Sequence, residues 1–303
     1  MAKATPKIIK KRLRSAANIK KLARSMEVVA ATKRKKAEDQ ALSMRPYAFE
    51  LTEILHQMIK EVGQPIDHPL LKKNKSRKIA LVFVTTDKGL TGSMTAEATR
   101  RLLREIKEAE TRGLQVELIA LGKKGTNFCL RSGYTLRANF VKDQESYSVN
   151  NVYPLAHLLM KDYQDGRYAE IRVVYTEFIS ALKQRAEVFT VLPLKIDQPL
   201  PVSVRVTGAQ TTPVKQATVT FSFEPSAFDL LETLLPAYVR AKLYWSLLEV
   251  NASEYAARML AMRQAADNAG EMISDLQLEY NQMRQSAITQ ELAEIVGASN
   301  IKR

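Results

Sequence analysis

Two glycine-containing stretches have the residue types of a phosphate-binding loop. The first, Thr86 to Ser93, reads Thr-Asp-Lys-Gly-Leu-Thr-Gly-Ser and stands between an apolar run and an amphipathic one, as phosphate loops stand between a strand and a helix. The second, Gly122 to Gly125, reads Gly-Lys-Lys-Gly. Neither has the spacing G-x-x-x-x-G-K-[ST] or G-x-G-x-x-G. Backbone conformation alone therefore explains these glycines, and a nucleotide site is disfavoured.

Other chemistry has little support in the residue pattern. The chain has one cysteine, and its three histidines are scattered, so no metal-ligand cluster is expected. No spacing suggests a nucleophile with its base, or a pair of catalytic carboxylates. Cys129 stands between Phe128 and Leu130 and is interpreted as a core residue. We therefore expect no catalytic site, no cofactor and no metal. A single cysteine excludes an internal disulfide and fits a reducing compartment.

The net charge of +14 is concentrated at one end of the chain. Residues 1–36 carry thirteen Lys and Arg against one acid, Glu27, whereas residues 226–303 carry seven against ten Asp and Glu. A basic helix of this kind is either a solvated surface or a surface for an acidic partner. Nucleic acid is one such partner, but no aromatic or base-reading pattern accompanies the charge.

Apolar residues at alternating steps of three and four predict the coiled-coil seam of a long C-terminal helix, from about Pro236 to Val296. Polar residues fill the positions between them, and only Gly270 weakens the helix. Because a lone helix with an apolar seam is unstable in water, a partner helix is required. The seam consists of Ala241, Trp245, Leu248, Ala252, Tyr255, Met259, Met262, Ala266, Ala269, Ile273, Leu276, Tyr280, Met283 and Ala287.

The N-terminal stretch supplies that partner. Residues 2–62 read as one long helix with Pro6 in its first turn, and Pro46 is expected to bend it. Its stripe begins Ile9, Leu13, Ala16, Ile19, Ala23, Met26, Ala30 and continues at similar steps to Val62. We expect the two helices to pair antiparallel within one chain.

Size complementarity suggests the register of this pair. If facing residues have numbers that add up to about 310, small residues meet large ones at each level, as close packing requires. Ala30 then faces Tyr280, and Ala48 faces Met262. In this register residues 298–303 form the free tip.

The spacing of apolar residues changes in the middle of the chain. Short apolar runs alternate with amphipathic ones, which predicts a parallel sheet with helices on its faces. Expected strands are 78–85, 116–121, 136–141, 171–178 and 187–192, with an edge strand at 217–223; expected helices are 95–112, 123–131 and 150–163. Residues 194–216 read as a loop, and 224–226 as a cap before the last helix.

The predicted fold class is α+α/β, a long antiparallel coiled coil of the N- and C-terminal helices with an inserted Rossmann-like α/β domain. The coiled-coil shaft comprises 1–62 and 226–303, the α/β domain comprises 76–223, and residues 63–75 connect them.

Both ends of the chain resemble the γ subunit of F-type ATP synthases of the bacterial type. The N-terminal likeness lies in Ile9-Lys-Lys-Arg-Leu-Arg-Ser15 and in Met26-Glu-Val-Val-Ala-Ala-Thr-Lys33. The C-terminal likeness, which is more specific, lies in Ala252-Ser-Glu-Tyr-Ala-Ala-Arg-Met259, in Ala266-Asp-Asn-Ala-Gly270 and in the run from Tyr280 to Gly297. Asp87-Lys-Gly-Leu-Thr-Gly92 resembles the family's glycine loop, although Ser93 and Thr95 stand where the family usually has glycine and asparagine.

The resemblance implies a central-stalk rotor subunit of a proton-translocating ATP synthase, a non-catalytic part of the enzyme complex. Its implied partners are the α and β subunits (a hexamer of three of each), the ε subunit and the membrane c-ring. No nucleic acid is expected, and membrane association would run through the c-ring. The coiled coil would stand inside the hexamer, which cycles conformationally during ATP synthesis or hydrolysis as the c-ring turns the shaft.

Two groups of contact residues follow from the resemblance. A base loop on the ε and c-ring side comprises Asp87, Lys88, Gly89 and Gly92. Contacts to the sleeve formed by the α and β subunits comprise Lys20, Lys21, Arg24, Met26, Lys33, Arg34, Arg258, Arg284, Gln285, Thr289 and Glu291. For each charged residue, ordinary helix solvation is the alternative.

The remaining expectations concern location and regulation. No cysteine stands in 194–216, where chloroplast members carry a redox-active pair, so that thiol switch is excluded. The lack of a transit peptide favours a bacterial protein, peripheral on the cytoplasmic face of the plasma membrane. Two other functions stay open: a nucleic-acid-associated coiled-coil scaffold, against which the acidic surplus after Ser226 counts, and a small-molecule enzyme built on the α/β domain.

Overall fold

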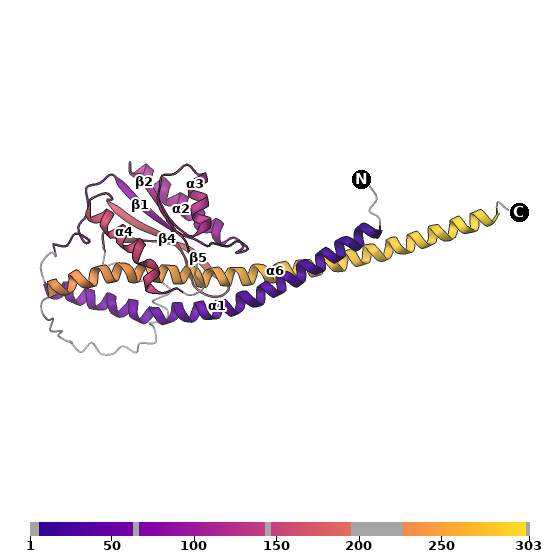
Figure 1. The fold of residues 1–303 in the computed structure, drawn as a ribbon, viewed down its shortest axis with the longest axis horizontal. Helices are drawn as coiled ribbons and strands as arrows, with labels where there is room; N and C mark the ends of the chain where they lie inside the picture. The colour runs from indigo at the N-terminus through magenta and orange to yellow at the C-terminus, as the bar shows by residue number, and fades with distance from the viewer. Residues whose placement is uncertain (1–5, 63–66, 143–146, 195–226, 301–303) are drawn as a thin grey trace. The chain divides into compact units, whose positions relative to one another are not determined.

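The computed structural model describes residues 6–62, 67–142, 147–194 and 227–300 and divides the chain into two compact units. The helical unit comprises residues 1–31 and 258–303, and the sheet unit comprises residues 32–257. Two long helices, α1 (Pro6–Val62) and α6 (Ala227–Asn300), contribute to both units (Figure 1). The expected helices at both ends of the chain are thus confirmed.

Proline interrupts neither long helix. α1 continues through Pro46, and α6 begins nine residues before Pro236, so it starts earlier than expected. Leu231 and Leu235 are fully buried just before that proline, and their packing offsets the one backbone hydrogen bond that proline removes. The expected strand at 217–223 and the cap at 224–226 lie outside the described residues. In the described part of the chain, no helix combines the length and apolarity needed to cross a bilayer.

A five-stranded sheet lies in the described part of the sheet unit, with strand order β3-β2-β1-β4-β5. Its strands are β1 (Lys78–Val84), β2 (Gln115–Leu121), β3 (Leu136–Phe140), β4 (Glu170–Phe178) and β5 (Gln184–Leu192). β1, β2, β3 and β4 pair in parallel, as expected. β5 pairs antiparallel with β4 because residues 179–183 form a short hairpin connection without a crossover helix.

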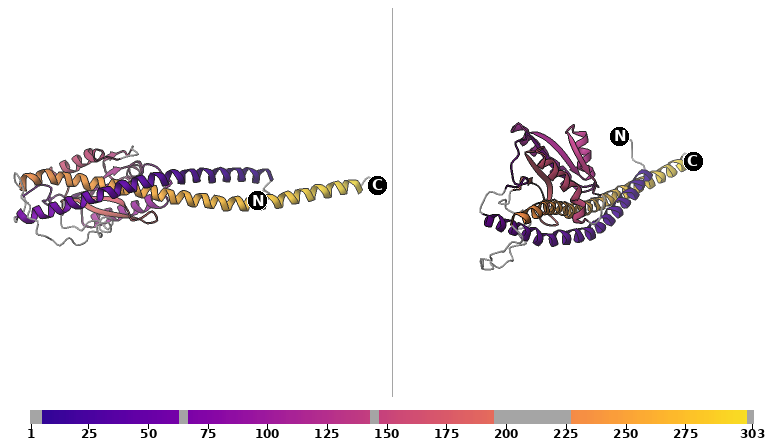
Figure 2. Two further views of the ribbon diagram at one scale, coloured as in Figure 1. Left: turned by 90° about the horizontal axis from the view of Figure 1, so that it is seen from below. Right: turned by 60° about the vertical axis from the view of Figure 1, so that its left-hand side comes forward.

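Side chains alternate between the two faces of the sheet. Ile79, Leu81 and Phe83 pack with the helices α2 (Met94–Thr111) and α3 (Lys123–Arg131). Ala80, Val82 and Val84 face the opposite core, formed with η1 (Val149–Val152), α4 (Tyr153–Gln164) and the parts of α1 and α6 in this unit (Figures 1 and 2). The sheet is thus buried on both faces, which explains its continuous apolar runs.

In the helical unit the two helices bury one narrow seam. Every predicted seam residue of α6 from Met259 to Met283 is buried or half-buried, but the last one, Ala287, is exposed, so its placement in the seam is wrong. On α1, Ile9, Ala16, Ala23 and Ala30 are buried at heptad spacing. The expected placement of Ile19 and Met26 in this seam is wrong, since their side chains are 56% and 37% exposed. They form a second apolar stripe beside the first, together with Leu22 and Val29, which are also exposed.

The predicted register is also wrong. Arg263 pairs with Glu27, with Nε 3.0 Å from Oε1, and Gly270 lies beside the Lys20 ammonium group. Tyr280 packs with the cluster around Ile9 and Ala16, not against Ala30. The α6 partner of each α1 residue is therefore roughly twenty positions, or three heptads, earlier than predicted. A seam of recurring alanines looks alike after each heptad, so size complementarity could not select among these registers.

Candidate partner-contact surfaces

The segment that follows β1 is joined by hydrogen bonds to the start of α3. The backbone N–H of Lys123 donates to Asp87 Oδ1 at 2.7 Å, and that of Lys124 donates to the Thr86 carbonyl at 3.0 Å. The Gly125 N–H donates to Thr85 Oγ1 at 2.8 Å. These are the first N–H groups of α3, which a phosphate would need. The chain itself occupies them, so the stretch Gly122 to Gly125 does not offer these N–H groups to a phosphate.

Gly122 and Leu90 both have a backbone conformation with positive φ. Gly122 has φ of 105°, and a Cβ there would lie 2.5 Å from the Thr85 carbonyl oxygen, so only glycine fits. Leu90 has φ of 64°, a conformation that costs a non-glycine residue about 1–3 kcal/mol, and its side chain is 56% exposed. Asp87 is thus an internal cap, whereas Lys88 and Leu90 point to solvent and are available to a partner.

Cys129 is a core residue, as expected. Its side chain is fully buried on α3 among residues of the sheet, and burial raises the pKa of its thiol to about 11. A thiol that stays protonated at neutral pH is a poor nucleophile.

The predicted sleeve residues of the helical unit lie on exposed helix surface. Lys20, Lys21 and Arg24 are exposed, and Met26 belongs to the exposed apolar stripe. Arg24 donates to Glu27 Oε2 at 2.7 Å while remaining 64% exposed. Arg258 is half-buried. Lys20, Lys21 and Arg24 form a cationic surface on α1 beside its exposed apolar stripe, and such a surface suits an acidic partner that also carries apolar groups.

Glu27 joins the two helices, a structural role that the sequence reasoning missed. Its side chain is only 8% exposed and bridges Arg24 of its own helix and Arg263 of α6. It is the one acid among residues 1–36, and that isolation was a usable signal. A lone carboxylate in a basic helix predicts a cation opposite it on the facing helix. Pairing Glu27 with Arg263 would have selected the correct register of the two helices.

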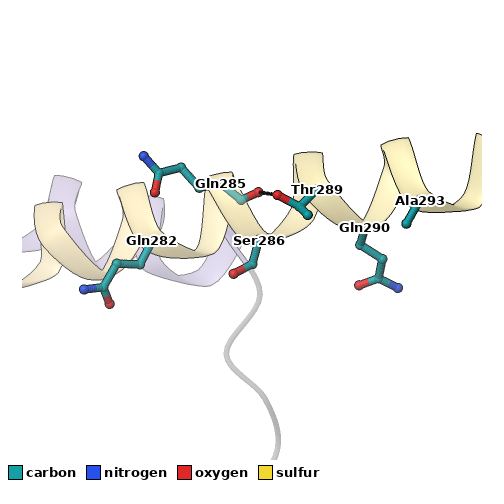
Figure 3. A pocket seen from close by; sticks show the side chains of 6 residues that line it. All are labelled: Gln282, Gln285, Ser286, Thr289, Gln290 and Ala293. Atoms are coloured by element: carbon teal, nitrogen blue, oxygen red, sulfur yellow. Dashed lines mark hydrogen bonds between the residues drawn. The ribbon is translucent and has the colours of Figure 1, made fainter.

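The end of α6 presents the remaining predicted residues. From Arg284 to Ala293 all side chains are exposed, including Gln285, Thr289 and Glu291. A shallow trough lies on one side of this segment (Figure 3), lined by Gln282, Gln285, Ser286, Thr289, Gln290 and Ala293. One helix alone lines it, so it encloses no ligand. Ile288, Leu292 and Ile295 are also exposed, at 49%, 56% and 66%, and recur at helical spacing.

Lys33 and Arg34 belong to the sheet unit, where both are half-buried. Arg34 pairs with Glu38 at 2.5 Å, one turn along α1. Lys33 also has an interaction of its own within the chain. Lys33 and Arg34 thus differ from Lys20, Lys21 and Arg24, whose side chains are exposed.

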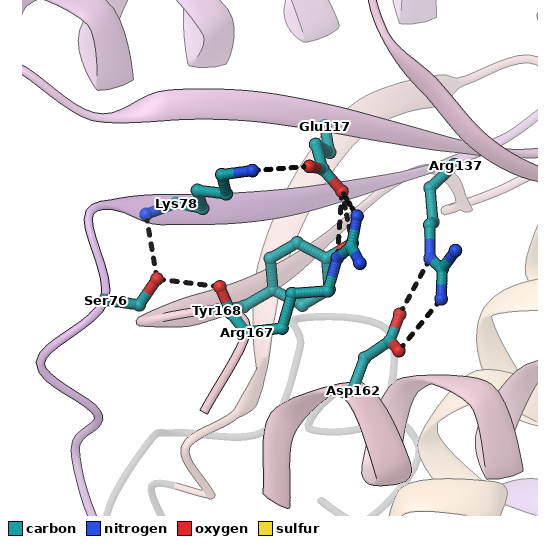
Figure 4. A network of polar contacts seen from close by, with 7 residues as sticks. All are labelled: Ser76, Lys78, Glu117, Arg137, Asp162, Arg167 and Tyr168. Carbon is teal, nitrogen blue, oxygen red and sulfur yellow. Dashed lines mark hydrogen bonds and ion pairs between the residues drawn. The ribbon is translucent and has the colours of Figure 1, made fainter. Parts of the chain in front are cut away.

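A buried carboxylate organises the edge of the sheet where the strands begin (Figure 4). Glu117 of β2 accepts hydrogen bonds from Lys78, Arg167 and Tyr168, at 3.1, 2.8 and 2.8 Å. Burial alone would raise the pKa of Glu117, but these three donors lower it to about 2. Arg137 and Asp162 form a second pair nearby, at 3.1 Å. Because all these groups are paired, the network joins strands and does not form a reactive site.

Comparison with known proteins places the chain in a family. A model of the family described as ATP synthase matches residues 5–300. The chain is 34% identical to the ATP synthase gamma chain of Nitrosococcus oceani over 296 residues, which covers 98% of this chain and 99% of that one. It is 35% identical to the ATP synthase gamma chain of Dehalococcoides mccartyi over 298 residues, covering 98% of each.

Solved structures share the fold. A chain of the Euglena gracilis mitochondrial ATP synthase in rotational state 3 superposes with a TM-score of 0.64 at 16% identity, covering 97% of this chain and 93% of that one. A rotor chain of the same enzyme in rotational state 1 gives 0.59 at 15% identity, with 93% and 98% covered. The likeness thus extends over both long helices and the sheet.

Proposed function

This chain belongs to the ATP synthase gamma chain family and is a central-stalk subunit of that enzyme complex; from this premise we propose how its surfaces couple rotation to catalysis. The helical unit stands inside the hexamer of α and β subunits, and the sheet unit joins the ε subunit and the c-ring. Ion flow through the membrane turns the c-ring and the chain with it. The chain then favours a different conformation of each β subunit in turn.

The helical unit carries this proposal, because its described surface is too apolar for a free helix pair. Each of its helices has one seam turned inward and a second apolar stripe turned outward. The outward stripes are Ile19, Leu22, Met26 and Val29 on α1, and Ile288, Leu292 and Ile295 on α6. Exposed stripes of this extent mark an interaction site. A surrounding sleeve of subunits is the partner that would cover both stripes.

The charged and polar residues around these stripes are proposed to contact the sleeve. Lys20, Lys21, Arg24 and Met26 would face acidic segments of the β subunit, and Lys33 and Arg34 would do so further along α1. Arg258, the first α6 residue of the helical unit, would also contact the sleeve. Arg284, Gln285, Thr289 and Glu291 would meet the sleeve at the far end of α6. The exposure of the groups around Arg24 and Arg284 supports this assignment, whereas Lys33, Arg34 and Arg258 are half-buried and rest on the resemblance alone.

The base loop is proposed to meet the ε subunit or the c-ring through Lys88 and its neighbours. Asp87, Gly89 and Gly92 would shape the loop, because Asp87 caps α3 and Gly92 has a φ of 55°. The exposed, strained Leu90 supports a partner there. The chain would thereby be held peripherally on the cytoplasmic face of the membrane. A cysteine in place of Lys88, cross-linked within the complex, identifies the neighbouring subunit by mass; a cross-link to β alone would contradict this placement.

Reconstitution tests the proposed function as a whole. Purified α, β and ε subunits are assembled with this chain on membranes that contain the c-ring, and ATP synthesis driven by an ion gradient is measured. We expect synthesis with the complete set and none without the chain. A matched variant, Arg284→Ala with Gln285→Ala, should lower synthesis or the yield of complex while leaving the helicity of the isolated chain unchanged. Synthesis that proceeds equally well without the chain would contradict the proposal.

A further inference from the structure

Within the sheet unit, α6 carries an unusual set of buried polar side chains between Tyr244 and Glu254. Glu249 and Ser253 have no exposed surface, and Tyr244 and Glu254 are each 7% exposed. Buried polar groups need partners, and a seam that only packs would use apolar residues here. The partners of these side chains show what this stretch of helix is fixed to.

One side of the stretch is tied to the end of β4. Glu249 accepts a hydrogen bond from the backbone N–H of Phe178 at 2.8 Å, and Ser253 Oγ donates to the Thr176 carbonyl at 3.4 Å. Glu249 and Ser253 are one helical turn apart, which is a rise of about 6 Å along the helix. Thr176 and Phe178 are two residues apart on β4, which is about 6.6 Å along the strand. The matching repeats let both hydrogen bonds form at once.

The other side is tied to the connection between β3 and α4. Glu254 pairs with Lys142 at 3.5 Å, and the Lys142 side chain is only 1% exposed. Tyr244 donates its hydroxyl proton to the Tyr147 carbonyl at 2.8 Å. Gln40 of α1 donates to the same carbonyl at 2.5 Å, so both long helices hold this connection.

These contacts point in different directions around the helix axis. At about 100° per residue, Tyr244 and Glu254 each lie roughly 140° from Glu249, on opposite sides. Turning the helix by about 20° about its own axis would move atoms at its rim by about 2 Å, which is enough to break a hydrogen bond. Packed apolar side chains also resist turning, but hydrogen bonds depend more steeply on direction. The polar set therefore opposes rotation of α6 relative to the sheet.

We propose that Glu249, Ser253, Glu254 and Lys142 form the torque-bearing joint of the subunit, acting as positioning residues that stop α6 from turning within the sheet unit. The inference rests on the proposed function, in which rotation enters through the sheet unit and leaves through the helices. Without the joint the complex would still assemble and hydrolyse ATP, but hydrolysis would drive less ion transport. The joint is therefore expected to affect the coupling of ATP hydrolysis to ion transport and not the folding stability of the subunit.

The sharpest variant replaces the buried ion pair by two methionines, Lys142→Met with Glu254→Met. A buried pair exchanged for apolar residues of similar volume usually keeps or gains stability, but the directional contact disappears. In the reconstituted complex we expect unchanged ATP hydrolysis and unchanged thermal unfolding, with a marked loss of ion pumping per ATP hydrolysed. The matched control is Arg137→Met with Asp162→Met, an ion pair whose two members lie on β3 and α4 and not on α6, and it should pump normally.

Glu249 gives an independent check. Glu249→Leu removes the acceptor for the Phe178 N–H and should lower pumping per ATP, whereas Glu249→Gln keeps an acceptor oxygen and should restore it. Pumping ratios equal to wild type in both the double methionine variant and Glu249→Leu would overturn the proposal. So would a double methionine variant that fails to fold, because the pair would then be structural. If the wild-type complex itself does not couple hydrolysis to transport, the proposed function fails instead.

Discussion

The same helix behaves differently in the two units. Within the sheet unit α6 is buried almost all round from Val239 to Ala257, while in the described part of the helical unit it buries only Met262, Ala266, Ala269 and Leu276. The first segment lies against a sheet and other helices, and the second has one partner helix with an alanine seam. The sheet unit therefore has a core of its own, whereas the helical unit exposes apolar stripes on its described surface. Changes at matched positions in the two units can test this difference.

The largest effect is expected at Gly122 in the sheet unit. Gly122→Ala forces a Cβ against the Thr85 carbonyl at a φ that L-residues avoid. Both the clash and the strain destabilise the fold, together by about 3 kcal/mol or more. Urea unfolding of the isolated chain measures the loss. A stability within 1 kcal/mol of wild type would show that the loop after β1 is looser than described.

The next effect concerns the carboxylate of Glu117. Glu117→Gln keeps one acceptor but removes the charge that Arg167, Lys78 and Tyr168 share, for a loss of about 2–3 kcal/mol at neutral pH. The pKa of Glu117 in the folded protein is lowered to about 2, so the ionised form stabilises the fold above its ordinary pKa near 4.5. This contribution is lost as the pH falls through about 2.

A pH series of unfolding measurements isolates that contribution. The stability difference between wild type and Glu117→Gln should be constant above pH 5 and should shrink steadily towards pH 2. A difference that does not change with pH would mean that Glu117 is not ionised in the folded protein.

A smaller effect, a gain in the stability of the helical unit, is expected from a disulfide that fixes the register of its two helices. Ala23 and Ala266 are buried seam residues that lie between the contacts Glu27–Arg263 and Lys20–Gly270. Ala23→Cys with Ala266→Cys should oxidise readily within one chain and stabilise the pair by about 2 kcal/mol. Ala30→Cys with Tyr280→Cys, the pair of the rejected register, should stay reduced. Mass analysis after oxidation decides between them.

The smallest effect is expected at Gly270, the helical counterpart of Gly122. A Cβ there would meet only the end of the flexible Lys20 side chain, 3.1 Å from Nζ. Gly270→Ala should therefore raise the stability of the helical unit by about 0.5–1 kcal/mol, through helix propensity alone. Hydrogen exchange of the amides around Gly270 measures it. Faster exchange in the variant would mean that the helices approach more closely than described.

The sequence predicted those features that depend on local period. Steps of three and four along α6 identified its seam from Ala241 to Met283, and apolar runs located the five described strands within a few residues. Register and facing pairs depend on contacts between distant residues, so Glu27 and Arg263 were not paired, and Ile19 and Met26 were assigned to the wrong stripe. The Asp87 cap on α3 likewise joins two loops that only the fold brings together. The assignment of contact residues to particular subunits stays a prediction, because it depends on chains other than this one.

Direct observation of rotation tests the central claim. Leu130 on α3 is 66% exposed, so Leu130→Cys can carry a bead, while Cys129 is buried and its thiol stays protonated. The hexamer is tethered to a surface with this chain at its centre, and ATP is added. We expect the bead to turn continuously in one direction, at a rate set by the ATP concentration. A bead that stays still on complexes that hydrolyse ATP would contradict the role of this chain as the rotor.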